Sequence, residues 1–279
     1  KKNTINISSN FRKVFRKIAY SLKNDQEVDD EVISNSNEKE KNIPSSRVLN
    51  LFKVVKNEKK DFRVKFTVKP GRVWSDGTPI TGVDLLLSHV VASNDYSTTA
   101  GLGDPSDGDK KPVFDSVSYG GAYGTNVVGL PVLSNNNMTV TVRFGKPLPD
   151  WELLAPGPSP VHALSLLADG KKGLQSASVN NAAKAKFLSA FTSKNTAALK
   201  KMGDVWTNAY NIRTIDSSTN KLLLISNGGF IVESAVPKTS MTLTANPKYN
   251  SGPKMSGTID TIVFKVITDG TAAVQALAN

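Results

Sequence analysis

Few side chains in this sequence have the types and spacing that catalysis or metal binding requires. The chain has 279 residues, no cysteine and two histidines, His89 and His162. A thiol nucleophile, a disulfide framework and a cysteine-ligated metal site are therefore excluded. The histidines lack the local spacing of a zinc motif, and a lone histidine packs more often than it catalyses. We therefore expect no enzymatic activity, no bound metal and no cofactor.

Two glycine-rich stretches could approach a ligand closely, because glycine has no side chain. They are Gly120–Gly124 and Ser226–Gly229. Both lack the lysine and the spacing of a phosphate-binding loop. The sequence therefore gives no sign of a nucleotide site.

The elements that must position any functional residue begin with a strand. Apolar and polar side chains alternate along Phe62–Lys69, which is typical of a half-buried strand. Pro70 and Gly71 then favour a turn. Thr81 lies three residues before Asp84, the spacing of a helix start. Apolar side chains recur after it at helical spacing, at Val83, Leu86, Leu87, Val90 and Val91. We expect an amphipathic helix that packs on the strand.

Trp74 lies between this strand and this helix. Its large apolar ring is expected to fill the corner between them, and its indole N–H then needs a partner. A ligand-stacking role for the ring stays open as the alternative.

The later sequence continues the mixture of strands and helices. Alternation predicts a second strand over Met138–Phe144, after a turn at Asn135–Asn137. Alternating Ile262, Phe264 and Val266 predict another strand, and a helix is expected to begin at Thr271 and to include Ala278. From about Asp61 onward, the chain is therefore predicted to be α/β.

Five sequence features, each weak alone, occur in an order that is specific in combination. They are the motif Trp74, Ser75, Asp76, Gly77, Thr78, Pro79, Ile80, Thr81, a proline-rich stretch at 145–160, the turn Ser226–Phe230, the motif Asn246, Pro247, Lys248, Tyr249, and the stretch 259–269. Their order and spacing resemble the extracytoplasmic solute-binding proteins of oligopeptide and dipeptide ABC importers, the bacterial extracellular solute-binding protein family 5. The resemblance spans roughly residues 62–279. The family usually has an aromatic residue where this chain has Asn250.

The resemblance implies an incomplete periplasmic-binding-protein-like fold of type II. Residues 61–145 correspond to a small subdomain that carries the Trp-Ser-Asp-Gly motif, and residues 146–279 to part of the first main lobe. On this mapping the second lobe and the earliest strands of the first lobe are not among the 279 residues. We therefore expect residues 1–279 alone to bind peptides weakly or not at all.

The implied function is ligand capture. Family members close two lobes on a solute and deliver it to the permease subunits of the importer in the membrane. A peptide is the expected solute, while nickel, haem and sugar oligomers are used elsewhere in the superfamily. The alternative is a truncated or fused structural or interaction fragment that binds no ligand. The sequence does not name the ligand.

Two tyrosines are the weak candidates for ligand contact. Tyr119 and Tyr123 lie about where peptide binders of the family present an aromatic side chain toward the cleft. A role in packing the loop is equally open. The motif residues Trp74, Ser75, Asp76, Gly77, Asn246, Pro247 and Tyr249 are expected to be structural.

The resemblance also implies an extracytoplasmic location, either periplasmic or at the cell surface. Full-length family members carry a secretory signal and, in Gram-positive bacteria, a lipid-modified cysteine that anchors them to the membrane. Neither feature occurs in these residues. Localisation and anchoring therefore rest on the resemblance alone.

Residues 1–60 have a different composition and match no part of the resemblance. Apolar side chains at helical spacing among basic ones predict a basic amphipathic helix over 11–23. Such a helix can lie on an anionic membrane or pack on its own protein, and both remain open. The acidic, polar stretch Asn24–Pro44 is expected to be a solvated linker.

The formal net charge of +11 raises the question of nucleic-acid binding. No recognition helix, zinc finger or RNA-binding motif occurs in the sequence, and basic residues are found along its whole length. A generally positive surface close to an anionic cell envelope explains the charge more simply. We therefore expect no nucleic-acid partner.

Overall fold

The computed structural model describes residues 62–104, 107, 109, 111–114, 121–253, 259–267, 269–271 and 274–275. The chain divides into two units, residues 1–59 and 60–279, and every described residue belongs to the second unit. The predicted helix over 11–23, the predicted linker Asn24–Pro44 and the candidate Tyr119 lie outside the described residues.

The first sheet has the antiparallel order β1-β3-β2. Its strands are β1 (Phe62–Thr67), β2 (Val132–Ser134) and β3 (Thr139–Phe144), so both strands predicted here are confirmed within two residues. Phe62 lies opposite Phe144 and Thr67 lies opposite Thr139. The turn between β2 and β3 has positive φ at Asn135, Asn136 and Asn137, a conformation that asparagine tolerates better than most residues.

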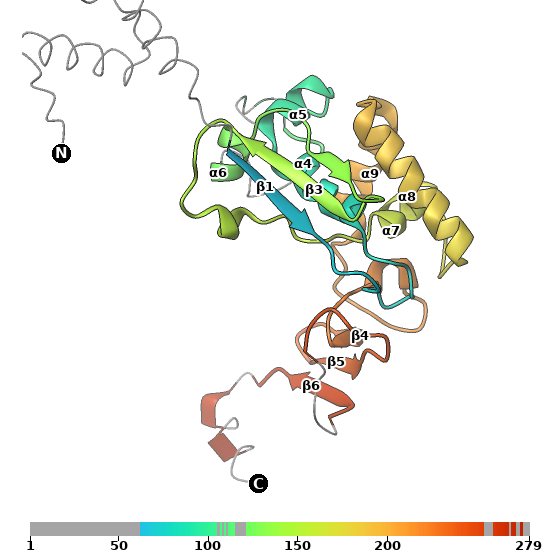
Figure 1. Cartoon of the computed structure of the whole chain (residues 1–279). Coiled ribbons are helices and arrows are strands. Elements are labelled where there is room, and N and C mark those ends of the chain that lie inside the picture. The colour runs from blue at the N-terminus through green and yellow to red at the C-terminus, as the bar shows by residue number, and fades with distance from the viewer. Residues whose placement is uncertain are drawn as a thin grey trace, which may run out of the picture. The chain divides into compact units, whose positions relative to one another are not determined.

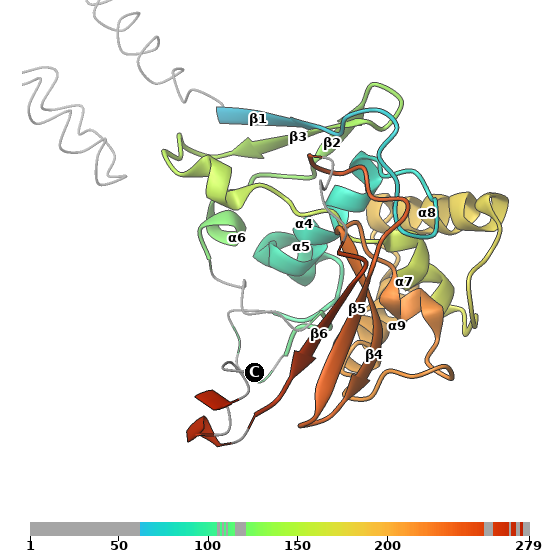
Figure 2. The ribbon, with the colours of Figure 1, turned by 90° about the horizontal axis from the view of Figure 1, so that it is seen from below.

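Helices cover one face of this sheet (Figure 2). The predicted helix begins after Thr81 as a 3-10 turn, η1 (Gly82–Leu85), and continues as α4 (Leu86–Ala92). Asp84 fixes its start, because Oδ2 of Asp84 accepts a hydrogen bond from the Thr81 backbone N–H at 2.8 Å. The helical elements that follow are α5 (Asn94–Thr99), α6 (Ala122–Asn126), η2 (Trp151–Leu154), α7 (Val161–Ala168), α8 (Ala177–Thr192), α9 (Thr196–Asp204), η3 (Val205–Ala209) and η4 (Lys221–Leu224).

A single hydrophobic cluster joins the first sheet to these helices. Its buried members come from β1, β3, α4, α5 and the later helices α7, α8 and α9, and include Val64, Val90, Tyr96, Phe144, Leu164, Phe187, Phe191 and Met202. The cluster therefore contains residues from both sides of the subdomain boundary predicted between residues 145 and 146, and that division stays a prediction.

The second sheet is antiparallel, in the order β4-β5-β6 (Figure 1). It contains β4 (Phe230–Val236), β5 (Ser240–Ala245) and β6 (Thr261–Lys265), and β6 confirms the strand predicted around Phe264. A backbone bridge between Ile215 and Ala235 ties β4 to the preceding loop. Of the helix predicted to begin at Thr271, the structure describes Thr271, Val274 and Gln275, all helical.

The described part of the chain is thus mixed α/β, as predicted. None of its helices is both long enough and apolar enough to cross a membrane.

Trp74→Ala should lower the free energy of unfolding by about 3 kcal/mol, the lower end of the range for truncating a buried aromatic ring. The ring is 2% exposed and packs near His162, with the ring centres 6.4 Å apart. The loss stays at the lower end because no described residue pairs with the indole N–H, so its removal relieves an unsatisfied donor.

Urea denaturation of the wild type and the variant measures this difference. Leu153→Ala serves as the control, since Leu153 is exposed and should lose less than about 0.5 kcal/mol. Equal denaturation midpoints for the wild type and Trp74→Ala would contradict the packing role of Trp74.

Candidate functional site

The Trp74–Thr81 segment folds back on itself between β1 and η1. Backbone hydrogen bonds run from Trp74 N to Thr78 O at 2.9 Å and from Ile80 N to Arg72 O at 2.8 Å. Gly77 has a φ of 94°, which favours glycine because a side chain rarely adopts it. The loop is therefore a turn closed by its own backbone hydrogen bonds, and these bonds fix the positions from which its side chains project.

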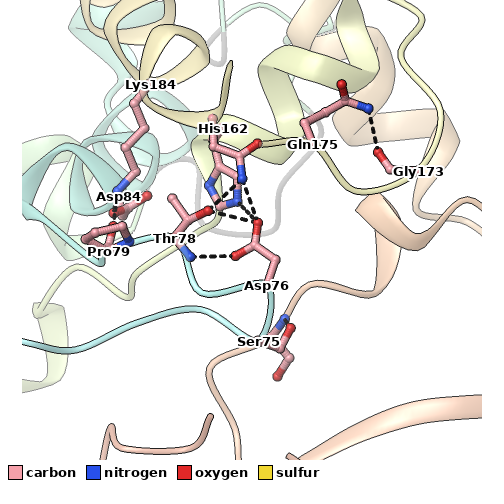
Figure 3. Close-up of polar contacts among 11 residues, drawn as sticks. Ser75, Asp76, Thr78, Pro79, Asp84, His162, Gly173, Gln175 and Lys184 are labelled. Carbon is pink, nitrogen blue, oxygen red and sulfur yellow. Dashed lines mark hydrogen bonds and ion pairs between the residues drawn. The ribbon is translucent and has the colours of Figure 1, made fainter. Parts of the chain in front are cut away.

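Asp76 is the centre of a buried polar network (Figure 3). Its Oδ1 accepts a hydrogen bond from the backbone N–H of Thr78 at 2.9 Å. Three side chains converge on its Oδ2: the Thr78 hydroxyl at 2.9 Å, the His162 Nε2 at 3.0 Å and the Asn180 Nδ2 at 3.1 Å. His162 belongs to α7 and Asn180 to α8, so one carboxylate joins the loop to two helices.

These contacts decide the ionisation of Asp76. Burial opposes the charged form, but the hydrogen bonds from His162 and Thr78 and the electrostatic interaction with His162 outweigh it, and the pKa of Asp76 is lowered to about 2. Asp76 is therefore a carboxylate at neutral pH, and the side chains of Asp76 and His162 are both almost completely buried.

A second buried pair lies next to the first. Asp84 accepts a charge-assisted hydrogen bond from the Nζ of Lys184 on α8, and the same Nζ also donates to the carbonyl of Pro79. Burial raises the pKa of Asp84, while the ammonium group of Lys184 opposes that rise. Removing either partner would leave a buried charge without compensation.

The loop also binds the segment around Ser226 that precedes β4, which we call the approach to the second sheet. Ser75 and Ser226 exchange two hydrogen bonds, from Ser75 N to Ser226 O at 2.8 Å and from Ser226 N to Ser75 Oγ at 3.1 Å. The side chain of Asn250 accepts from Val73 N at 3.2 Å and donates to Gly71 O at 2.6 Å.

The Asn246–Tyr249 motif forms a turn beside this junction. The Nδ2 of Asn246 donates to Gly228 O at 2.9 Å, and its Oδ1 accepts from Lys248 N at 3.0 Å. The backbone N–H of Tyr249 donates to the carbonyl of Asn246 at 3.0 Å. Asn250 directly follows this motif and binds the backbone of Val73, which directly precedes Trp74. The Trp74–Thr81 and Asn246–Tyr249 motifs therefore meet at one junction.

Comparison with known proteins identifies the family. The family model of the bacterial extracellular solute-binding proteins, family 5 Middle, matches residues 48–279. The chain belongs to this family. No curated protein matches the chain.

Several solved structures are similar to this chain. A periplasmic EDTA-binding protein, EppA, is 22% identical, with a TM-score of 0.47 over 77% of this chain and 29% of its own. The oligopeptide-binding protein OppAIV of Borrelia burgdorferi is 16% identical, with a TM-score of 0.42 over 78% of this chain and 33% of its own. An oligopeptide-binding protein of Thermus thermophilus, solved with a pentapeptide, is 16% identical, with a TM-score of 0.42 over 78% and 30%. The chain thus spans 29% to 33% of the length of these structures.

Tyr123, which the sequence suggested as a candidate for ligand contact, is largely buried in the structure. Tyr123 lies in α6, is 9% exposed, and its hydroxyl lies 2.9 Å from the Nδ1 of His89. Burial raises the pKa of Tyr123 and lowers the pKa of His89 to about 3. Tyr123 is therefore packed beside a His89 that is neutral at pH 7, and its contact with a ligand stays a prediction.

Several residues at this site were not anticipated from the sequence. Asn180 and Lys184 lie on the same face of α8 as the buried Phe187 and Phe191. Polar residues at helical spacing within an apolar face were the available signal, because such side chains need buried partners. Ser226 and Asn250 were noted in the sequence as part of a turn and as a departure from the family pattern, but nothing there predicted their contacts with the Trp74–Thr81 loop.

No group of three or more His, Cys, Asp or Glu side chains within the described ranges could hold a metal ion.

Asp76→Asn should lower the free energy of unfolding at pH 7 by roughly 2 kcal/mol, the equivalent of the drop in pKa from 3.8 to about 2. Because the pKa is depressed in the folded state, the carboxylate's contribution is fully present above about pH 4 and is lost as the pH falls toward 2. The variant should therefore show a shallower loss of stability over that range. Urea denaturation at a series of pH values measures it, with the exposed Asp150→Asn as control. An unchanged pH dependence in Asp76→Asn would argue against an ionised Asp76.

Asn250→Ala should loosen the junction between the loop and the second sheet. Loss of two hydrogen bonds is worth about 1–2 kcal/mol and should raise hydrogen exchange at the backbone amides of Val73 and Ser75. Asn211→Ala, at an exposed position outside the junction, is the control. Exchange at both amides that matches the wild type would show that Asn250 does not hold the junction.

Proposed function

We propose that this chain forms part of the extracytoplasmic substrate-binding component of an ABC importer, and that the imported solute is a peptide. The observation that carries the proposal is the match of residues 48–279 to the family 5 solute-binding proteins. In this role, two lobes close on the solute, bury most of its surface and fix it with a few polar groups. The protein then delivers the solute to the permease subunits, and a lipid anchor holds it at the membrane.

The geometry of the buried networks is consistent with capture rather than chemistry. Asp76 is hydrogen-bonded to His162, and Asp84 pairs with Lys184, so both carboxyl groups have partners inside the fold. The neutral His89 is bonded to Tyr123. These groups hold helices and loop together, which leaves ligand contact to other surfaces of the whole protein.

One observation favours the alternative, a structural or interaction fragment that binds no ligand. Tyr123, the described candidate for ligand contact, is buried and engaged with His89. Detection of a bound solute in the purified protein distinguishes these two functions.

The complete product of the gene that encodes this chain provides the test. Purified without added ligand and then denatured, it should release peptides that mass spectrometry can identify. Refolded protein should then give binding heat with tri- to pentapeptides, and none with a maltotriose or nickel salt control. Binding of sugar or nickel alone would overturn the peptide assignment, and the absence of any bound solute would favour the structural alternative.

Residues 1–279 alone should bind the same peptides more weakly than micromolar. Micromolar affinity corresponds to about −8 kcal/mol, and association first loses at least about 4 kcal/mol of rigid-body entropy. At about 25 cal/mol per Å², roughly 500 Å² of apolar surface would have to be buried. The buried Tyr123 adds none of that area. Calorimetry measures the affinity, and micromolar binding would show that these residues contain the whole site.

A further inference from the structure

The positive charge of the described unit is concentrated in its helical segment. Residues 160–225, which contain α7, α8, α9 and η4, have nine Lys or Arg, three Asp and no Glu. Residues 62–159 have eight Lys or Arg and nine Asp or Glu. Within this unit the surplus lies mostly in one segment, which indicates a surface with its own partner rather than a general requirement for solubility.

Four exposed lysines of this segment gather around the loop between α7 and α8. We name them the lysine corner: Lys171, Lys172, Lys186 and Lys221. The side chain of Asn220 holds the corner together, because its Nδ2 donates to Lys171 O at 3.0 Å and its Oδ1 accepts from Gly173 N at 3.0 Å. Asp169 pairs with Lys186, and no ion pair joins the other three lysines to any described residue.

The loop is held in shape and faces open space. The Nε2 of Gln175 donates to Gly173 O at 3.0 Å (Figure 3). It also donates to Lys172 O at 3.2 Å. Gly170 and Gly173 both have a φ of 71°, and no atom lies within 4 Å of the position that a Cβ would take at either glycine. The backbone at this corner can therefore approach an extended surface closely.

An exposed leucine lies among the lysines. Leu174 directly follows Gly173 and is 55% exposed, although it belongs to a loop with a defined hydrogen-bonded shape. Val179, in the first turn of α8, is 37% exposed. Basic side chains that surround exposed apolar ones are typical of surfaces that rest on a lipid bilayer, where cations meet the headgroups and apolar groups enter the interface.

We propose that the lysine corner binds the surface of an anionic lipid bilayer, with Leu174 entering the headgroup region. Lysine ammonium groups are compact point charges, which suit a diffuse layer of phosphates, whereas arginine would favour bidentate contact with individual phosphates. Single-stranded nucleic-acid sites stack bases on aromatic side chains, and the exposed apolar side chains here are aliphatic. Binding at this surface requires no bound solute and would orient the protein on a membrane.

The test is sedimentation of the whole 279-residue chain with vesicles of phosphatidylcholine containing phosphatidylglycerol, compared with phosphatidylcholine alone. Each lysine at an anionic surface contributes roughly fivefold in affinity, so Lys171→Gln with Lys172→Gln should weaken binding by roughly 25-fold. The matched control, Lys111→Gln with Lys146→Gln, removes two exposed lysines elsewhere and should change binding little. Leu174→Ser should weaken binding that persists at high salt.

The outcomes separate the lipid surface from other anions. A preference for the anionic vesicles that the corner variant weakens by roughly 25-fold and the control keeps is the expected result. Equal losses in the corner and control variants would reduce the effect to general charge and overturn the proposal. So would unchanged binding by Leu174→Ser, displacement by inorganic phosphate at constant ionic strength, or a corner variant that loses affinity for a DNA duplex but not for vesicles.

Discussion

The buried carboxylate of Asp76 is the interaction on which the arrangement of the described body depends. Desolvation alone would expel this charge or neutralise it, so its presence requires compensation from several donors at once. The loop supplies Thr78, α7 supplies His162 and α8 supplies Asn180. These donors can converge only when both helices are docked on the loop, and the ionisation of one side chain is therefore linked to the packing of three segments.

The same loop has a second set of contacts on its other side. Ser75 binds Ser226, and the backbone around Val73 binds Asn250, so neighbouring residues of the Trp74–Thr81 motif serve different parts of the fold. Asp76 holds the helices while Ser75 holds the approach to the β4-β5-β6 sheet. The motif therefore connects the helices to the approach of the second sheet. Because Ser75 and Asp76 are adjacent, one short segment can make both sets of contacts.

Local patterns in the sequence predicted individual strands and a helix start. They did not predict the long-range contacts of the Trp74–Thr81 loop. Alternation predicted β1 and β3, because a strand buried on one face requires a period of two. It also predicted β6, although Val263 and Phe264, on opposite faces of that strand, are both at least half exposed. The Thr81 and Asp84 spacing gave the start of η1 and α4, because the cap is formed within four residues. The partners of Asp76 are 86 and 104 residues away in the sequence, and Asn250 is 177 residues from Val73. No local period encodes such distances, since these contacts exist only after the helices and the second sheet have docked.

The contact between the Trp74–Thr81 loop and helices α7 and α8 is polar, although an apolar contact there would cost less desolvation energy. The unpaired polar atoms around Asp76 indicate what this polar contact contributes. Trp74 Nε1, His162 Nδ1 and Asn180 Oδ1 are buried without a partner among the described residues. Each such atom costs about 1–3 kcal/mol, so the network adds less stability than its hydrogen bonds alone would indicate. We infer that its main contribution is specificity. An apolar loop could slide against α7 and α8 with little change in energy, whereas the carboxylate of Asp76 finds its donors in one register only. A fixed register of this loop in turn fixes Ser75 and the backbone of Val73 for their contacts with Ser226 and Asn250, so the buried carboxylate is linked through the loop to the approach of the second sheet.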